Sequence, residues 1–140
     1  MDNIGSLLLK TCKAHRGLIA RRLDNIGLYP GQDGLIYHLS ANDGLTMSEL
    51  VTKMKIKHPT LFAMVNRMVK AGIIKKTKDK IDKRTSRIYL TAKGRKLVAQ
   101  LSRIWQEIET QLLGGMDKDE KYYAMMILKK IIHNSDEDNV

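Results

Sequence analysis

The sequence predicts a mainly α-helical chain of 140 residues with one small β-ribbon. Apolar residues recur at three- and four-residue steps through most of the chain, which is the period of an amphipathic helix. The stretch from about residue 73 to 90 instead places β-branched and aromatic residues on both sides of a polar loop. At this length we expect one cooperative fold rather than two separate globular domains.

Two helices are predicted before residue 45. The first covers residues 3–24, and its apolar stripe consists of Ile4, Leu8, Cys12, His15, Ile19 and Leu23. Gly27 and Pro30 separate it from a short helix around residues 35–40, which stops at the turn signal Asn-Asp-Gly at 42–44.

Two central helices are predicted from their caps. Thr46 and Glu49 have the spacing of a capping box, in which each side chain accepts from the other's free backbone N–H. His58 is expected to be the N-cap of the next helix, with Pro59 at its first position and Gly72 at its end. The buried stripe of this helix is predicted to consist of Leu61, Val65, Met68 and Val69.

A charged hairpin follows these helices. Residues 73–74 and 87–90 are strand-like, and residues 77–86 between them are too charged to be anything but an exposed loop. The order of two helices and a basic ribbon predicts a winged helix-turn-helix at residues 30–93, with a wing of two or three strands.

Two long helices are predicted after the ribbon. The first runs from Thr91 to about Leu113, and its apolar seam consists of Leu97, Leu101, Ile104, Ile108 and Leu112. Gly114-Gly115 ends it, and Asp117 with Glu120 caps a last helix to about His133. Residues 1–29 and 94–134 are therefore expected to form a dimerisation region, because a second copy most simply covers their apolar faces. Residues 135–140 are expected to be a short acidic tail.

Positive charge is concentrated in the predicted winged helix. Between Leu50 and Lys96 the chain carries 15 Lys and Arg residues against two Asp and no Glu. This is the sign of charge that binds a phosphate backbone, so double-stranded DNA is the expected partner.

Several other classes of protein are excluded. Uncharged apolar stretches such as residues 4–9 are far shorter than the roughly 20 residues of a membrane span, so we expect a cytoplasmic protein with no membrane partner. No acid–base pair, activated nucleophile or Gly-rich phosphate loop occurs at usable spacing, so no enzyme, catalytic residue or cofactor is expected. The four histidines lie in different predicted elements, so no metal site is expected either.

Five motifs together resemble the MarR family of bacterial and archaeal transcription regulators. They are Leu-Tyr-Pro-Gly-Gln at 28–32, Thr-Met-Ser-Glu-Leu at 46–50, Arg-Met-Val-Lys-Ala-Gly-Ile at 67–73, Asp-Lys-Arg at 82–84 and Tyr-Leu-Thr-Ala-Lys-Gly-Arg at 89–95. The combination of Asp-x-Arg with Tyr-Leu-Thr-x-x-Gly is the most specific of them. The resemblance implies a homodimeric, sequence-specific regulator, expected to be a repressor, whose two winged helices bind a pseudo-palindromic operator.

The resemblance also implies which residues bind DNA. The helix after Pro59 is expected to enter the major groove, and Arg84 is expected to reach the minor groove while Asp82 holds it in a fixed pose. The DNA-binding candidates are His58, Pro59, Thr60, Phe62, Ala63, Asn66, Arg67, Lys78, Lys80, Asp82, Lys83 and Arg84.

Phe62 and Ala63 depart from the family pattern, which places a Thr or Ser and then an Arg or another polar residue on this base-facing side. Phe62 is the only phenylalanine of the chain. Two interpretations stay open. The ring contacts thymine methyl groups, or it packs back onto the protein and leaves base recognition to His58, Thr60 and Asn66.

Relatives in this family often bind a small molecule between their two regions, so an aromatic or anionic ligand that releases the DNA is a further expectation. Its candidate lining residues are His15, Arg16, Ile19, Tyr37, His38 and Trp105.

Two alternatives remain. Cys12, the single cysteine, suits either a redox-responsive regulator or a buried, inert thiol, and its place on the apolar stripe of the first helix favours burial. The winged helix could also belong to an architectural protein that coats DNA without sequence preference. A footprint on DNA distinguishes this protein from a sequence-specific regulator.

Overall fold

The computed structural model describes residues 2–136, and these fall into two compact units whose boundary lies between Trp105 and Gln106. The chain order of the elements is α1 (Ile4–Asp24), α2 (Gln32–Ala41), β1 (Leu45–Thr46), α3 (Met47–Met54), α4 (His58–Lys70), β2 (Ile74–Lys78), β3 (Ser86–Leu90), α5 (Ala92–Leu112) and α6 (Lys118–Asn134). Every predicted helix is present. The placement of residues 1–29 and 94–134 in one dimerisation region stays a prediction.

Local capping explains where several helices begin. Thr46 accepts from the backbone N–H of Glu49, and the Glu49 carboxylate accepts from the backbone N–H of Thr46, which is the predicted capping box of α3. Asp117 and Glu120 form the same arrangement at the start of α6. Asn3 with Ser6 forms a third capping box, at the start of α1, that was not among the predicted ones.

Two predictions for α4 are wrong in detail. The N-cap is Lys57, which makes no side-chain cap, so His58 is the first helical residue and not the cap. Pro59 fits one position further in, because the N–H that it lacks would still have no partner within the helix. Val69 is 39% exposed, unlike Leu61, Val65 and Met68, since it lies at the edge of the buried stripe.

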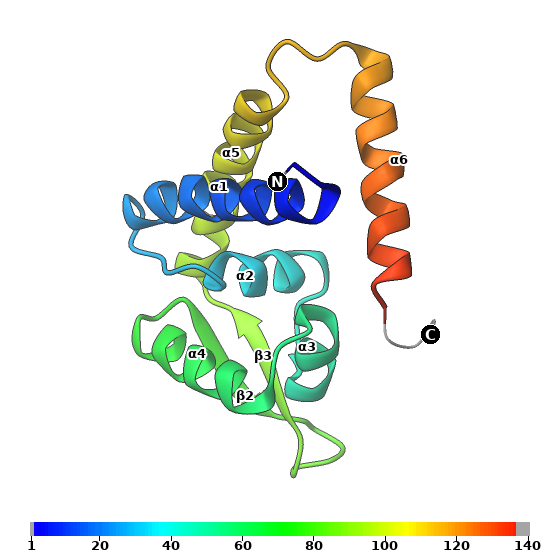
Figure 1. The fold of residues 1–140 in the computed structure, drawn as a ribbon. Coiled ribbons are helices and arrows are strands. Elements are labelled where there is room, and N and C mark those ends of the chain that lie inside the picture. Colours follow the sequence, from blue (N-terminus) through cyan, green and yellow to red (C-terminus); the bar gives the residue numbers. More distant parts are fainter. Residues whose placement is uncertain (1, 137–140) are drawn as a thin grey trace. The chain divides into compact units, whose positions relative to one another are not determined.

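The three strands form an antiparallel sheet in the order β1-β3-β2. Leu45 pairs with Ile88, and Ile74 pairs with Leu90, so β3 lies in the centre. β2 and β3 reach Lys78 and Ser86, so the wing loop is residues 79–85 and shorter than the predicted 77–86. Figure 1 shows this hairpin extending away from α1, so that its loop lies at the far end of the first unit.

The core of the first unit joins the sheet to the surrounding helices. Fully buried side chains from α2, α3, α4, β3 and α5 meet there, and they include Leu35, Leu50, Leu61, Ile88 and Leu101. Gly94, near the start of α5, allows a close approach, because a Cβ at this position would collide with the backbone carbonyl of Ile73. The core therefore fixes α5 and the wing against each other.

The apolar seam of α5 is largely used within a single chain. Leu97, Leu101, Ile104 and Ile108 are buried, whereas Leu112 is 38% exposed. The protomer itself therefore covers most of the seam, and the share of this helix in a dimer interface stays a prediction.

Helices α1 and α6 leave much apolar surface exposed. Of the predicted stripe of α1 only Leu23 is buried, and Ile4 is 75% exposed. No residue of α6 is buried, and Leu128 is 48% exposed. The acidic tail predicted at 135–140 lies mostly outside the described residues.

Candidate nucleic-acid interface

One face of α4 carries all the predicted base-reading residues. The following side chains are exposed: His58, Pro59, Thr60, Phe62, Ala63, Asn66 and Arg67. The opposite face is anchored in the core by Leu61, Val65 and Met68. The helix therefore holds this exposed surface rigidly, with Gly72 in a left-handed conformation at its end (φ 75°).

The structure bears on the two interpretations of Phe62. The Nζ of Lys76, on β2, lies 5.1 Å from the centre of the Phe62 ring, within the range of a cation–π contact. Phe62 is still 45% exposed. One side of the ring thus contacts the protein while the rest stays accessible, and the pair joins α4 to the wing.

The wing loop is built from two successive aspartate turns. The carboxylate of Asp79 accepts from the backbone N–H groups of Ile81 and Asp82 at 3.2 and 2.9 Å. The carboxylate of Asp82 accepts from the backbone N–H of Arg84 at 3.1 Å and from the Thr85 hydroxyl at 3.3 Å. Such turns fix a loop locally without a hydrophobic core.

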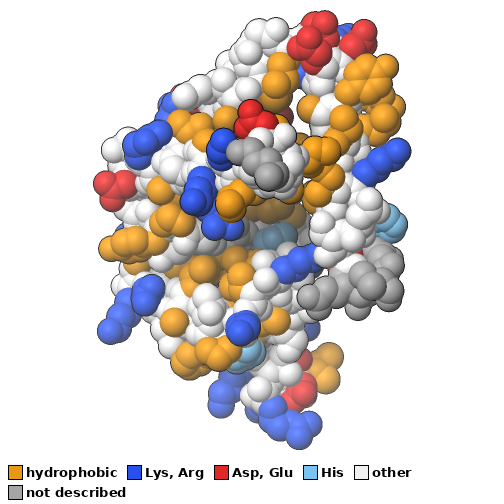
Figure 2. All heavy atoms as spheres, in the orientation of Figure 1, with side chains coloured by type: hydrophobic (Ala, Val, Ile, Leu, Met, Phe, Trp, Pro, Cys, Tyr) orange, Lys and Arg blue, Asp and Glu red, His pale blue; other side chains and the backbone are white. Residues whose placement is uncertain are grey.

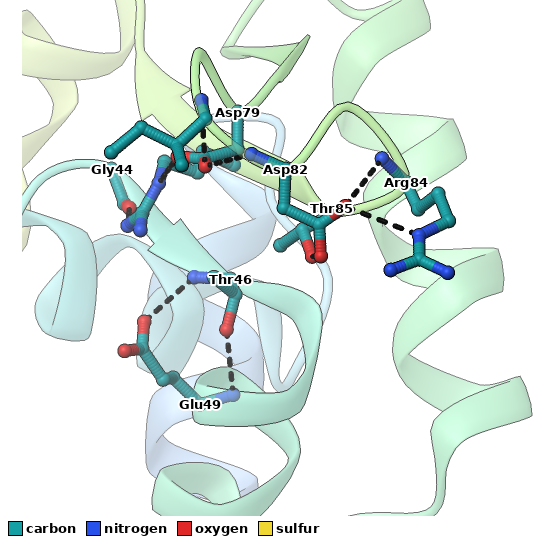
Figure 3. A network of polar contacts seen from close by, with 9 residues as sticks. Gly44, Thr46, Glu49, Asp79, Asp82, Arg84 and Thr85 are labelled. Atoms are coloured by element: carbon teal, nitrogen blue, oxygen red, sulfur yellow. Dashed lines mark hydrogen bonds and ion pairs between the residues drawn. The ribbon is translucent and has the colours of Figure 1, made fainter.

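Asp82 also orients Arg84, as predicted. The Nε of Arg84 donates to Oδ1 of Asp82 at 3.3 Å, and the Arg84 side chain is 93% exposed. Figure 3 shows Arg84 on the outer side of the loop, away from Gly44 and Asp79. The guanidinium therefore keeps most of its donors available for a partner.

A second ion pair, which was not among the predicted features, fastens the base of the wing. Arg87 on β3 donates from Nε to Asp79 at 2.6 Å and from Nη1 to the carbonyl of Gly44 at 2.8 Å. This links the loop to the turn before β1 (Figure 3). The only available signal was an Asp and an Arg eight residues apart across a predicted hairpin.

The environment of Asp79 favours its charged form. The backbone N–H of Asp82 and the guanidinium of Arg87 lower the pKa of Asp79 from 3.8 to about 2. The same hydrogen bond raises the pKa of Arg87. The pair is therefore ionised at every pH at which the protein would normally be studied.

Positive side chains surround this fixed loop. Lys78 ends β2, and Lys80, Lys83 and Arg84 are exposed in the loop itself. Figure 2 shows Lys and Arg side chains gathered at the lower end of one face, over the wing. α4 and the wing thus present two adjacent surfaces that suit a groove and its flanking phosphates.

The candidate ligand residues are only partly brought together. Tyr37 makes edge-to-face contacts with His38 and Trp105, with ring centres 5.3 and 5.7 Å apart. Ile19 packs against the core, and no hydrogen bond or ring contact in residues 2–136 joins His15 or Arg16 to these rings. The aromatic residues of the predicted ligand site, Tyr37, His38 and Trp105, therefore lie together. His15 and Arg16 are not joined to them.

The structure also describes the surroundings of Cys12, the acidic, histidine and cysteine side chains, and the length of the apolar helices. Cys12 is exposed in the single chain, because only the C-terminal part of α1 reaches the core. The burial of its thiol stays a prediction for the proposed dimer, in which a second copy would cover α1. No three His, Cys, Asp or Glu side chains among residues 2–136 come together in a way that could hold a metal ion. Within the same residues, no helix is long and apolar enough to cross a membrane.

Comparison with known proteins agrees with the fold and the family. Residues 28–86, which span α2 to the wing, match the model of the MarR family. This part of the chain resembles a MarR-family domain. It is 25% identical over 130 residues to the HTH-type transcriptional regulator YybA of Bacillus subtilis, and the match covers 87% of each chain.

Two solved structures share the whole MarR-type fold. A MarR-family regulator from Listeria monocytogenes in complex with a 26-mer DNA superposes with a TM-score of 0.86 at 23% identity, covering 96% of this chain and 89% of that one. BpsR of Bordetella bronchiseptica, whose DNA binding is regulated by 6-hydroxynicotinic acid, gives a TM-score of 0.83 at 20% identity, covering 93% and 98%. The predicted fold class, a mainly α-helical winged helix with a small sheet, is thereby confirmed.

Proposed function

We propose that this protein is a sequence-specific DNA-binding transcriptional regulator of the MarR family that acts as a repressor. The observation that carries the proposal is the pairing of two surfaces in the first unit: the exposed face of α4 and the aspartate-braced wing with Arg84 at its outer side. The Listeria relative in complex with DNA supports the same partner for this chain.

In this proposal α4 enters the major groove. Thr60, Asn66 and Arg67 supply donors and acceptors for base edges and phosphates, and the free side of Phe62 supplies an apolar surface for thymine methyl groups. The wing lies over the neighbouring minor groove, where Arg84 meets the negative potential of a narrow A·T-rich segment. Lys78, Lys80 and Lys83 neutralise flanking phosphates.

The active species is proposed to be a homodimer on a pseudo-palindromic operator. The exposed apolar side chains of α1 and α6, among them Ile4 and Leu128, are the surface that a second copy would cover. A small aromatic or anionic effector that releases the DNA is proposed by analogy with BpsR, with Tyr37, His38 and Trp105 as the aromatic part of its site.

The proposal is tested by selecting duplexes from a randomised pool with the full-length protein. We expect one palindromic consensus with half-sites about one helical turn apart, and a footprint confined to it. An architectural DNA-binding protein would instead enrich no sequence and protect any duplex evenly. That outcome would replace the regulator with the alternative function.

A further inference from the structure

The wing loop carries one apolar side chain, and it is more exposed than any other large apolar side chain among residues 2–136. Ile81 is 96% exposed, between Lys80 and Asp82. A single exposed isoleucine is common on protein surfaces and needs no explanation by itself. The position of Ile81 and the way in which its backbone is fixed distinguish it from that ordinary case.

The backbone at Ile81 is held by the ion pair at the base of the wing. The Ile81 N–H donates to the Asp79 carboxylate at 3.2 Å, and Asp79 is in turn fixed by Arg87 at 2.6 Å. A second bond, from the backbone N–H of Asp79 to the carbonyl of Thr85 at 2.8 Å, closes the loop. The loop is therefore ordered before any partner arrives, which reduces the entropic cost of binding through it.

Ile81 and Arg84 project from the same braced loop of residues 79–85. The side chain of Arg84 is 93% exposed, and together they offer a cation and a branched apolar group. The minor groove presents a negative floor between walls of deoxyribose C–H groups. Proteins that bind there combine Arg with apolar side chains such as Ile, Leu or Phe.

We propose that Ile81 is a minor-groove contact of the wing, packing against the deoxyribose walls beside the position taken by Arg84. This inference rests on the proposed function, because it requires the wing to approach DNA. It assigns the isoleucine an apolar share of the binding energy that no lysine of the loop provides. It also makes Asp79 a positioning residue for DNA binding, since Asp79 fixes the backbone that presents Ile81.

The test uses the full-length protein and the duplex that the wild-type protein selects from a randomised pool. Ile81→Ala should lower the affinity for this duplex by about tenfold, because it removes three carbons that are partly buried against the DNA. The salt dependence should keep its wild-type slope, since no phosphate contact is removed. Lys80→Ala is the matched neighbour and should reduce that slope. Ile81→Leu should recover most of the affinity lost in Ile81→Ala.

Hydroxyl-radical footprinting adds a direct readout, because the radical attacks deoxyribose in the minor groove. The wild-type protein should protect sugars at the wing site, and Ile81→Ala should lose that protection while keeping the protection from α4. If Ile81→Ala binds and protects like the wild type, Ile81 is an ordinary solvated residue and the inference is overturned, while the proposed function stands. If the wild-type protein binds no duplex, the inference about Ile81 and the proposed function both fail.

Discussion

At the scale of single residues, the two aspartates of the wing have different tasks. Asp82 faces outward and orients Arg84, the side chain proposed to meet DNA. Asp79 is turned inward, with its side chain only 17% exposed, and connects the loop to Arg87 and through it to Gly44. One aspartate therefore shapes the contact surface, and the other fixes that surface to the sheet.

Arg84→Ala should weaken binding to the selected duplex by roughly 1–3 kcal/mol, the size of a specific base or groove contact. The side chain is almost fully exposed, so the melting temperature should not change. Lys80→Ala is the control, and its smaller loss should be the same on every duplex. Titration of labelled duplex measures both. Wild-type affinity in Arg84→Ala would show that the minor-groove assignment is wrong.

The Asp79–Arg87 pair predicts a pH dependence of stability. Because the folded pKa of Asp79, about 2, lies below its usual 3.8, the folded state binds fewer protons than the unfolded state between these values. The stabilisation is thus present above about pH 4 and is lost as the pH falls towards 2. The difference in melting temperature between wild type and Asp79→Asn should shrink over that window. A difference that is constant from pH 6 to pH 2 would contradict the account.

One of the two ion pairs of the wing could be predicted from the sequence, and the other could not. Asp82 and Arg84 are two positions apart in a recognisable motif, so their pairing was predictable. Asp79 and Arg87 meet only because the hairpin has one particular register, with Thr77 opposite Arg87. Register depends on tertiary packing and turn geometry, which residue spacing alone does not specify.

At the scale of elements, short-range signals located the helices and tertiary contacts set their details. The capping boxes of α3 and α6 lie within four residues, so the sequence predicted both. The start of α4 was misplaced by one residue, because Pro is tolerated anywhere in the first turn. The exposure of Val69 and the burial of most of the α5 seam depend on which neighbours pack there.

The close contact between α5 and Ile73, which lies between α4 and β2, predicts different effects for two glycine substitutions. Gly94→Ala should destabilise the protein by about 1–3 kcal/mol, since the new methyl would collide with the Ile73 carbonyl. Gly34→Ala, in α2, places its methyl at an ordinary 3.7 Å from Met54 and should be neutral or slightly stabilising. Urea unfolding of both variants measures the difference. Equal effects would mean that Gly94 is not a packing requirement.

At the scale of the whole molecule, the proposed function needs two copies of the chain. One winged helix offers one α4 and one wing, whereas a palindrome offers two half-sites. The exposed apolar residues of α6, which include Tyr122, Met125, Ile127 and Leu128, are unusual for a helix that stays in water. Dimerisation through such a surface would link folding to protein concentration.

The melting temperature should therefore rise with protein concentration. Leu128→Lys should abolish that dependence and give a monomer by light scattering, because a charge would be buried in the proposed interface. Lys129→Ala, at the next position of α6, is the control for helix stability. A Leu128→Lys protein that stays dimeric would exclude α6 as the interface.

The central claim, specific recognition of one DNA sequence by α4 and the wing, is tested most directly by comparing two dissociation constants. They are measured for the selected duplex and for a scrambled duplex of equal length, at several salt concentrations. We predict that the selected duplex binds at least about a thousandfold more tightly at physiological salt. Both affinities should fall with a log–log slope of about −0.9 per neutralised phosphate. Equal affinity for the two duplexes, or an affinity that does not change with salt, would contradict the account.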